Sequence, residues 1–446
     1  MSLTRLFFSF RGRIARGEFW YALLVVLSVF TVLSIVLAGL FGLDAAWPLY
    51  PPLYWALLAV AVKRYHDIGR SGLWLLLLAV PIIGPAWVIF SLGFRKGHQV
   101  ENRFGPVPAL EQLDYFRVGE RGVSSQTTIS DVTGLVSVEV TRTLRPATVP
   151  ELRAAVAESD GPISIGGGRF SMGGQIASPG SLHIDMRGLN AVIEFAPRER
   201  RIRVQAGIRW CDIQRFLDPH DLSVKIMQTY ANFTVGGSLS VNSHGRYVGL
   251  GPVILSVQSI ALVTADGMLH HASPGENSEM FYAAVGGYGA LGVIVEAELD
   301  VVPNARVACA TAKMPAADYT RYFRENIRNN SGAVFHNADL YPPHYRRVRA
   351  QTWEETDKPV TQTSRLMPLR SSFPVQRYFM WAISETPFGK WRREFIVDPL
   401  VFFRQRVHWR NYEAGYDVSE LEPASRSETT YVLQEYFVPV ERFEEF

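Results

Sequence analysis

Two glycine-rich segments constrain the fold of this chain more than any other feature. The first is PISIGGGRFSMGGQ, residues 162–175, and the second is NFTVGGSLSVNSHGR, residues 232–246. Glycine lets a backbone approach a ligand closely and adopt positive φ angles. Successive backbone N–H groups in such a loop form a concavity that binds anions. Two such loops in one domain predict a ligand with a diphosphate and a long body, such as a dinucleotide.

Length, charge and cysteine content narrow the class of protein. The 446 residues are enough for two or three domains. The formal net charge of +3 argues against a nucleic-acid partner. Two cysteines, Cys211 and Cys309, are too few for a disulfide framework and fit a reducing compartment.

Apolar residues gather in three runs near the N-terminus: residues 19–43, 47–62 and 73–94. The first run is long enough to cross a bilayer. It is too long for a signal peptide, lacks a small-residue cleavage site, and is followed by two more runs. We therefore expect an all-α transmembrane domain over residues 1–108. The second run contains two prolines, and the third is broken by proline and glycine.

Basic residues flank these runs and bear on their topology. They are Arg5, Arg11, Arg13 and Arg16 before the first run, Lys63, Arg64 and Arg70 between the second and third, and Arg95 and Lys96 after the third. The positive-inside rule places all three flanks in the cytoplasm, which three full crossings cannot satisfy. We expect the broken third run to return as a helical hairpin. The alternative is that one weak charge bias is overruled.

The strings FSFRGRIARGEFWYALL, RYHDIGRSGLWLLL, PIIG and ENRFGP resemble the small bacterial YhaH-like inner-membrane family. This resemblance implies a bacterial inner (plasma) membrane location and no particular chemistry. His66 and Asp67 could form a proton relay or a ligand site. The alternative is that they are interfacial loop residues.

A polar linker is predicted over residues 109–135. Residues 136–144 alternate between apolar and polar, as a half-buried strand does. Pro150 and Glu151 then mark the start of a helix. Residues 163–165 form a strand that leads into the first glycine loop. The predicted local order is strand, helix, strand, glycine loop.

A third glycine-rich string, GGYGALGVIV, contains a formal G-x-G-x-x-G at Gly287, Gly289 and Gly292. A dinucleotide fingerprint of this form must follow a strand and open a helix. Here a helical stretch precedes the string and an alternating strand, residues 293–301, follows it. The context therefore excludes a Rossmann site. Before it, the Asp-Gly pair at residues 266–267 predicts a hairpin turn between two strands.

The three glycine blocks together resemble the FAD-binding domain of the vanillyl-alcohol oxidase type, also called PCMH-type, over about residues 140–303. The resemblance implies an α+β fold: a two-subdomain FAD-binding domain at residues 136–304 and a partial α+β cap domain at residues 305–446. It also implies FAD as the cofactor. No metal site is expected. A flexible surface turn is the alternative interpretation of the first loop taken alone.

The same resemblance assigns residues to the cofactor. The first loop would hold the diphosphate on its backbone amides, with a further donor from the Ser171 hydroxyl. Many members have a covalently linked histidine at the position of Arg169, so this chain should bind FAD non-covalently. His244 should lie near the flavin or its phosphates, with acid–base chemistry and a structural role as alternatives. Ile294 should contact the adenine side. The implied cofactor-binding residues are Gly166, Gly167, Gly168, Arg169, Phe170, Ser171, Met172, Thr229, Thr234, Gly236, Gly237, Ser238, Asn242, Ser243, His244, Gly245, Gly287, Gly292 and Ile294.

The string TTYVLQEYFVPVERFEEF, residues 429–446, is similar to the aldonolactone and alditol oxidase subfamily, where an EYFVP-like strand lines the substrate face. Gln434 and Glu435 are thereby candidates for binding substrate hydroxyls, with His244 as a third catalytic candidate. Tyr436 would face away by strand alternation. An ordinary strand of the cap sheet is the alternative. In the family a further helix–strand unit follows this string. We therefore expect a shortened cap domain in this chain and uncertain catalytic competence.

Aromatic and basic residues mix in the cap, as in KWRREF, which suits a polar-substrate cleft or a solvated basic face. The sequence as a whole predicts a membrane-anchored FAD-dependent oxidoreductase with its FAD domain in the cytoplasm. It would oxidise a CH–OH group of a sugar, polyol or aldonolactone, lipid-linked sugars included. Oxygen, a quinone or a carrier protein would accept the electrons. A catalytically inactive flavin-binding sensor or assembly module is the main alternative, and a transporter-like membrane domain with a degenerate tail is another.

Overall fold

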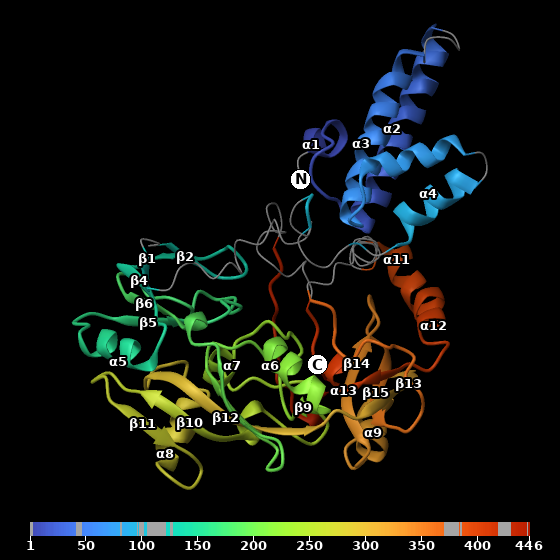
Figure 1. Ribbon diagram of the computed structural model, residues 1–446. Helices are drawn as coiled ribbons and strands as arrows, with labels where there is room; N and C mark the ends of the chain where they lie inside the picture. Colours follow the sequence, from blue (N-terminus) through green and yellow to red (C-terminus); the bar gives the residue numbers. More distant parts are fainter. Residues whose placement is uncertain are drawn as a thin grey trace. The chain divides into compact units, whose positions relative to one another are not determined.

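The chain forms two compact units, Met1–Arg117 and Val118–Phe446. The computed structural model describes residues 3–41, 47–80, 83–95, 97, 102–104, 122–124, 128–369, 383, 386–417, 430–443 and 445–446 (Figure 1). Several sequence predictions fall on positions outside these ranges: the end of the first apolar run at Leu43, Pro81, Lys96, and the boundary between the transmembrane domain and the linker. The boundaries proposed for the domains stay predictions.

The first unit is helical, as predicted. Its elements are α1 (Leu3–Phe8), α2 (Arg16–Phe41), α3 (Tyr50–Asp67), the 3-10 helix η2 (Gly72–Ala79) and α4 (Ile83–Gly93). Within the described part of the chain, one helical stretch, Arg16–Leu37, is long and apolar enough to cross a membrane. The third apolar run is two short helices that contact each other, η2 and α4. The two prolines of the second run lie in the first turn of α3, where proline is tolerated, and do not interrupt it.

A buried polar cluster surrounds Asp67 of the HDIGRSG string. Asp67 accepts hydrogen bonds from Arg64 and, at 3.1 Å, from Arg13. The Lys63 ammonium donates to carbonyls at and just beyond the end of α1, at 2.5 and 2.7 Å. Cations are favourable at helix C-termini. Asp67 and the neighbouring His66 lie in the last turn of α3, and these contacts favour a structural role for Asp67.

The second unit begins with a mainly parallel sheet of order β1-β4-β6-β5, in which β4 and β5 run parallel to β6. Its elements are β1 (Gly122–Ser124), β4 (Arg142–Arg145), α5 (Val149–Ala157), β5 (Ile163–Gly166) and β6 (Leu182–Asp185), beside the hairpin of β2 (Thr128–Ser130) and β3 (Ser137–Glu139). The predicted strand over residues 136–144 is therefore interrupted between β3 and β4. Helix α5 begins as predicted, because Thr148 caps the amide of Glu151 at 3.3 Å.

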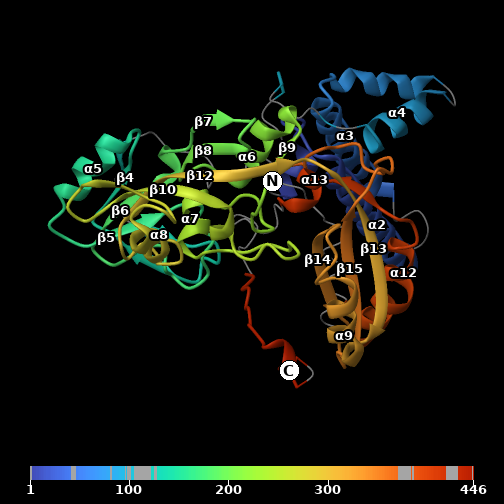
Figure 2. The same cartoon turned by 90° about the horizontal axis from the view of Figure 1, so that it is seen from below.

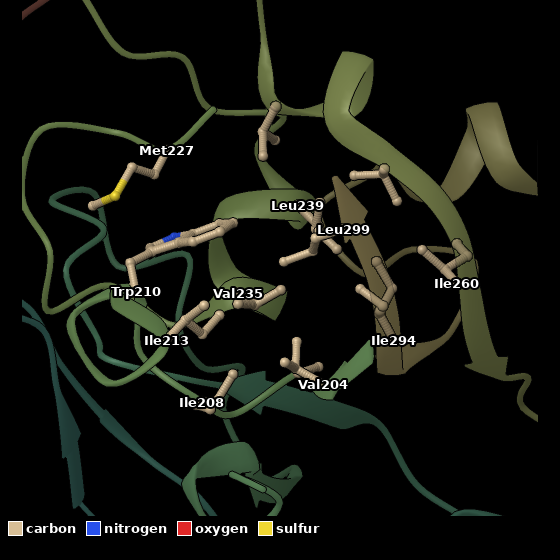
Figure 3. Close-up of a cluster of buried hydrophobic side chains, with 14 of the residues drawn as sticks. Val204, Ile208, Trp210, Ile213, Met227, Val235, Leu239, Ile260, Ile294 and Leu299 are labelled. Carbon is tan, nitrogen blue, oxygen red and sulfur yellow. The ribbon is translucent and has the colours of Figure 1, made fainter. Parts of the chain in front are cut away.

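An antiparallel sheet of order β11-β10-β12-β8-β7, with β9 paired to β12, follows. Its strands are β7 (Val192–Ala196), β8 (Arg201–Gln205), β9 (Leu222–Val224), β10 (Val257–Val263), β11 (Leu269–Ala272) and β12 (Val293–Pro303), with helices α6 (Trp210–Leu217), α7 (Val235–Ser240) and α8 (Ser278–Ala284). The predicted Asp-Gly turn joins β10 to β11, with Gly267 at φ +74°. Side chains from the sheet and from α6 and α7 form the main core (Figure 3).

The third sheet has the order β14-β15-β13-β16. Its elements are β13 (Arg306–Pro315), α9 (Ala316–Asn326), β14 (Ala333–Leu340), β15 (Arg347–Glu355), α11 (Pro387–Arg392), the π-helix η6 (Arg393–Val397), α12 (Asp398–Val401), β16 (Val407–Trp409) and α13 (Arg410–Ala414). The mixture of helices and sheets confirms the predicted α+β class.

The strand predicted in the C-terminal string is wrong for its described part. Residues 430–439 have no regular secondary structure, and a single 3-10 turn, η9 (Val440–Arg442), follows them. No strand in the described part of the chain pairs with these residues, and Tyr436 is exposed in the same way as Glu435, so the expected alternation is absent. Figure 2 shows this segment as an extended tail.

Candidate functional site

The three glycine-rich segments meet in one place. A Cβ added at Gly167 of the first loop would lie 2.2 Å from the Thr234 hydroxyl of the second. A Cβ at Gly289 of the third segment would lie 3.1 Å from Ile165, on the strand that leads into the first loop. The amide of Tyr288 donates to the carbonyl of Ser240 in α7 at 2.9 Å. Segments far apart in sequence thus build one backbone-lined site.

The first loop begins where β5 ends, at Gly166, which is in register with Asp185 of the parallel strand β6. A Cβ at Gly166 would lie 2.7 Å from the ring of His183. Arg169 adopts a left-handed φ of 60°, and its guanidinium points inward to within 3.9 Å of the Asp185 carboxylate. A Cβ added at Gly168 would lie 2.7 Å from the ring of Phe170. The arginine of the loop therefore points into the domain, and the glycines pack closely against neighbouring side chains.

Phe170, Ser171 and Met172 complete the first loop and are half-buried. The Phe170 ring stacks on Phe233 of the second loop, with ring centroids 4.9 Å apart. The Met172 sulfur accepts a hydrogen bond from the amide of Leu433 at 3.0 Å. The loop is therefore held between the second glycine loop and the C-terminal string.

Three arginines share one buried carboxylate beneath the first loop. Asp185 accepts hydrogen bonds from Arg145 at 2.6 Å and from Arg187 at 2.7 Å, with Arg169 further away. Burial alone would raise the pKa of Asp185, but the hydrogen bonds and positive charge of Arg187, with Arg145 and Arg169, hold it well below its usual range. Three guanidinium groups thus lie together beneath the first loop, and positive charge in this place favours an anion at the loop.

His183 lies beside this cluster in its neutral form. Burial, and then the charge of Arg169, lower the pKa of His183 to about 4. Its Nδ1 lies 3.0 Å from the Ser164 hydroxyl, whereas its buried Nε2, next to Gly166, has no hydrogen-bond partner among the described residues. The histidine therefore adds no charge to the cluster at neutral pH.

The second loop enters α7, whose first turn is fixed from two sides. The Thr234 hydroxyl caps the helix by accepting from the amide of Gly237 at 3.3 Å. The Ser238 hydroxyl accepts from the indole N–H of Trp210 at 2.8 Å, so this predicted cofactor-binding side chain points into the core. A Cβ at Gly236 would lie 3.0 Å from that of Ala206. What α7 presents at the loop is its backbone, with Gly237 exposed.

Residues 242–245 follow α7 in a tight turn. Asn242 adopts a φ of 46°, and its amide oxygen accepts from the amide of Ile254 at 3.2 Å. Ser243 is half-buried. A Cβ at Gly245 would lie 2.2 Å from the carbonyl of Met227, so this position requires glycine. The turn holds His244, between Ser243 and Gly245, at the protein surface.

The third segment also requires glycine. A Cβ at Gly287 would lie 2.2 Å from the carbonyl of Ala283, and one at Gly292 would lie 2.3 Å from that of Val263. Ile294 belongs to the hydrophobic core on β12 (Figure 3). The contact of Ile294 with the adenine side stays a prediction.

The structure brings two of the three catalytic candidates together. His244 Nε2 lies 3.5 Å from Glu435 Oε1, and both side chains are about half exposed. The ring of Phe437 lies edge-on to His244, with centroids 6.0 Å apart. Gln434 is exposed on the same string. The pair can orient an imidazole and accept or donate a proton at the surface of the site.

A buried network next to His244 ties the second loop to the cap sheet. Glu413 accepts from Arg246 at 3.1 Å and from the Tyr416 hydroxyl at 3.0 Å, and lies 3.0 Å from His408 Nδ1. Burial, and then the charge of Glu413, raise the pKa of Tyr416. The amide of Tyr416 donates to the carbonyl of Thr229 at 2.6 Å. Thr229 therefore contacts the cap through its backbone carbonyl.

Sequence reasoning did not find these two clusters. Arg187 is a near neighbour of Asp185 in the sequence, but Arg145 lies 40 positions away and reaches Asp185 through the pairing of β4 with β6. Glu413 is separated from Arg246 by 167 positions. The sequence feature that could have indicated the Glu413 cluster is Arg246, which directly follows the SHG string.

Comparisons with known proteins identify the second unit's family. Residues 140–273 match the family described as FAD binding domain. The chain contains an FAD-binding domain. Residues 7–106 match a family described as a protein of unknown function (DUF805). These matches confirm the two resemblances, their fusion in one chain, and FAD as the cofactor.

Curated relatives are similar to part of the chain. Alditol oxidase of a Streptomyces species is 32% identical over 179 residues, which cover 40% of this chain and 42% of that protein. Decaprenylphosphoryl-beta-D-ribose oxidase of Mycolicibacterium smegmatis is 34% identical over 154 residues, 34% of this chain and 33% of that protein. L-gulonolactone oxidase of Bos taurus is 24% identical over 247 residues, which cover 54% of this chain and 55% of that protein. The chain spans about half, or less, of the length of these relatives.

The residues present fit FAD. Glycines at which a Cβ would clash with neighbouring backbone or side chains let three segments converge closely. The arginine cluster supplies positive charge under the first of them. This donor set suits a diphosphate with a long body, as the sequence predicts.

Proposed function

We propose that this protein is an FAD-dependent oxidoreductase that oxidises a CH–OH group of a sugar, polyol or aldonolactone. The observation that carries the proposal is the convergence of three glycine segments in a chain with an FAD-binding domain, with the arginine cluster on Asp185 beneath the first segment. Relatives named as oxidases of an alditol, a ribose derivative and a lactone support the reaction class.

The backbone of residues 166–172 holds the diphosphate in this proposal, with charge from Arg145 and Arg187 beneath it. The glycines of α7 and of residues 287–292 approach the rest of the cofactor. Arg169 has no nucleophilic ring nitrogen and points toward Asp185, so the cofactor is bound without a covalent link. When bound, FAD supplies the hydride acceptor.

His244 and Glu435 carry out proton transfer from the substrate hydroxyl in this proposal. The Glu435 carboxylate, 3.5 Å from His244 Nε2, orients the imidazole, and the imidazole takes the proton of the substrate hydroxyl. Gln434, on the same string, binds a neighbouring hydroxyl. The side chains of His244 and Glu435 are both accessible, which suits a polar substrate that reaches the site from solvent or from the membrane surface.

The finer features of the proposal concern location and partners. Helix α2 anchors the chain in the bacterial inner membrane, and the FAD domain, residues 136–304, lies in the cytoplasm with the cap of residues 305–446. The N-terminal DUF805 match and the apolar stretch Arg16–Leu37 support the anchor. The bilayer makes a lipid-linked sugar an accessible substrate. Oxygen, a quinone or a carrier protein reoxidises the flavin.

The test is anaerobic reduction of the bound flavin by a panel of polyols, sugars and aldonolactones, followed by absorbance. At least one member should bleach the wild-type flavin, and His244→Asn should slow this step while retaining FAD. The matched control is His271→Asn, an exposed histidine on β11. If FAD is bound but nothing reduces it, the proposed activity is wrong, and the flavin-binding sensor or assembly module becomes the better account.

A further inference from the structure

The helical run α11–η6–α12, residues 387–401, has an inverted polarity. Its two acidic residues, Glu394 and Asp398, are buried and face the cap sheet. Glu394 Oε1 lies 2.9 Å from Lys313 Nζ and 2.9 Å from Arg347 Nε. Asp398 accepts a hydrogen bond from the Tyr341 hydroxyl at 2.6 Å. The run is therefore attached to the sheet by its polar face.

The large apolar side chains of the run are exposed, although the Phe395 ring also lies under the cations of Lys313 and Arg347. Seven large hydrophobic side chains lie on this run and just beyond it: Phe388, Trp391, Phe395, Ile396, Leu400, Val401 and Phe403. Leu400 is 72% exposed and Phe403 is 82% exposed. The rings of Phe388, Trp391 and Phe395 stack in a row, with successive centroids 6.0 and 5.7 Å apart. We call these seven residues the apolar ridge.

A helix on a water-soluble domain normally buries its apolar stripe and exposes its charges. A contiguous exposed apolar patch marks a surface that contacts something else. Here the buried ion pairs with Lys313 and Arg347 hold the run in the reverse orientation, so the exposure of the apolar ridge is built into the fold. Figures 1 and 2 both show α12 beside the strands of the cap sheet.

We propose that the apolar ridge is a membrane-contacting surface that inserts into the headgroup and acyl boundary of a bilayer containing anionic lipids. Phenylalanine, tryptophan and leucine on one face with basic residues nearby are typical of interfacial helices. Lys390 and Arg404 supply the basic residues, while both acidic residues are turned inward. The charge offered outward is thus positive, which complements anionic headgroups.

A bilayer fits better than a second protein because the same chain carries the stretch Arg16–Leu37, which is long and apolar enough to cross one. The inference does not depend on the proposed oxidation, since it rests on the cap's own surface. It adds a second, independent membrane contact in the C-terminal half of the chain. The cap would then lie at the membrane surface, within reach of a lipid-linked substrate or a quinone.

The experiment places a fluorophore on the full chain in vesicles of phosphatidylcholine and phosphatidylglycerol in equal amounts. Leu400→Cys and Phe403→Cys are labelled separately with bimane. Met268→Cys is the matched control, an exposed apolar position on the FAD-binding domain. The native thiols of Cys211 and Cys309 are buried and should not compete for label. Quenching by lipids carrying a nitroxide near the headgroup is compared with quenching by iodide in water.

We expect nitroxide lipids to quench the labels at positions 400 and 403, with loss of iodide quenching, and the reverse pattern at position 268. Quenching by iodide alone at all three positions would overturn the proposal. Shielding of positions 400 and 403 from both quenchers would also overturn it, because the N-terminal unit or a second copy of the chain would then cover the apolar ridge. Both readouts are independent of flavin content, so a failed oxidase assay leaves them unaffected.

Discussion

Replacing Gly167 by alanine should weaken FAD binding about 30-fold. The added Cβ would lie 2.2 Å from the Thr234 hydroxyl, about 1.2 Å closer than ordinary van der Waals contact. Relief requires rotation of Thr234, which removes the cap on the Gly237 amide at a cost of about 1 kcal/mol. A strained rotamer or a displaced loop costs about 1 kcal/mol more. Together these effects amount to roughly 2 kcal/mol.

The assay is titration of deflavinated, detergent-purified protein with FAD, followed by quenching of flavin fluorescence. Gly275→Ala is the matched control, because nothing lies within 4 Å of its Cβ position. A double-mutant cycle gives the sharper result: in a Thr234→Ala background the hydroxyl is gone, and Gly167→Ala should cost much less. Wild-type affinity in Gly167→Ala, or full additivity in the cycle, would refute the contact between the two loops.

Three further predictions concern single side chains. Burial, and then the charge of Arg169, lower the pKa of His183 to about 4, so the imidazole binds a proton at higher pH in the unfolded chain than in the folded one. The contribution of His183 to the free energy of unfolding is therefore complete above about pH 6.5 and falls by up to about 3 kcal/mol as the pH drops toward 4. Urea unfolding of His183→Gln across this range should lack that slope. Asp185→Asn leaves buried guanidinium groups without their counter-ion and should lower the free energy of unfolding by about 3–5 kcal/mol, whereas Asp212→Asn, in a partly exposed ion pair, should cost less than about 1 kcal/mol. Glu435→Gln should slow flavin reduction about 100-fold at unchanged FAD affinity, and a wild-type rate would exclude its role beside His244.

Local patterns in the sequence predict much of the FAD-binding domain. The proline and glutamate at the start of α5, the Asp-Gly turn before β11, and the alternation along β12 are all signals carried by neighbouring residues. The glycine loops are predictable for a related reason. Their glycines occupy positions where a Cβ would collide with backbone or side chains, so the residue type reports the geometry directly.

Features that depend on distant partners were missed or predicted wrongly. The β-rich string around Glu435 has strand-like composition, but no neighbouring strand pairs with residues 430–439, so they are irregular. Arg145 joins Asp185 only through the register of the parallel strands β4 and β6. KWRREF reads as a basic surface, yet its tertiary ion pairs turn Glu394 inward and leave Trp391 and Phe395 exposed. Which face of a helix is buried depends on its partner as well as on its own pattern.

The central claim is that the three glycine segments hold FAD without a covalent link. An absorption spectrum of the detergent-purified full chain, before and after acid precipitation, tests it most directly. We predict a yellow protein whose flavin is released into the supernatant, as expected for Arg169 at the first loop. Flavin retained in the pellet would contradict the non-covalent site. Colourless protein that also fails to bind added FAD would contradict the account as a whole.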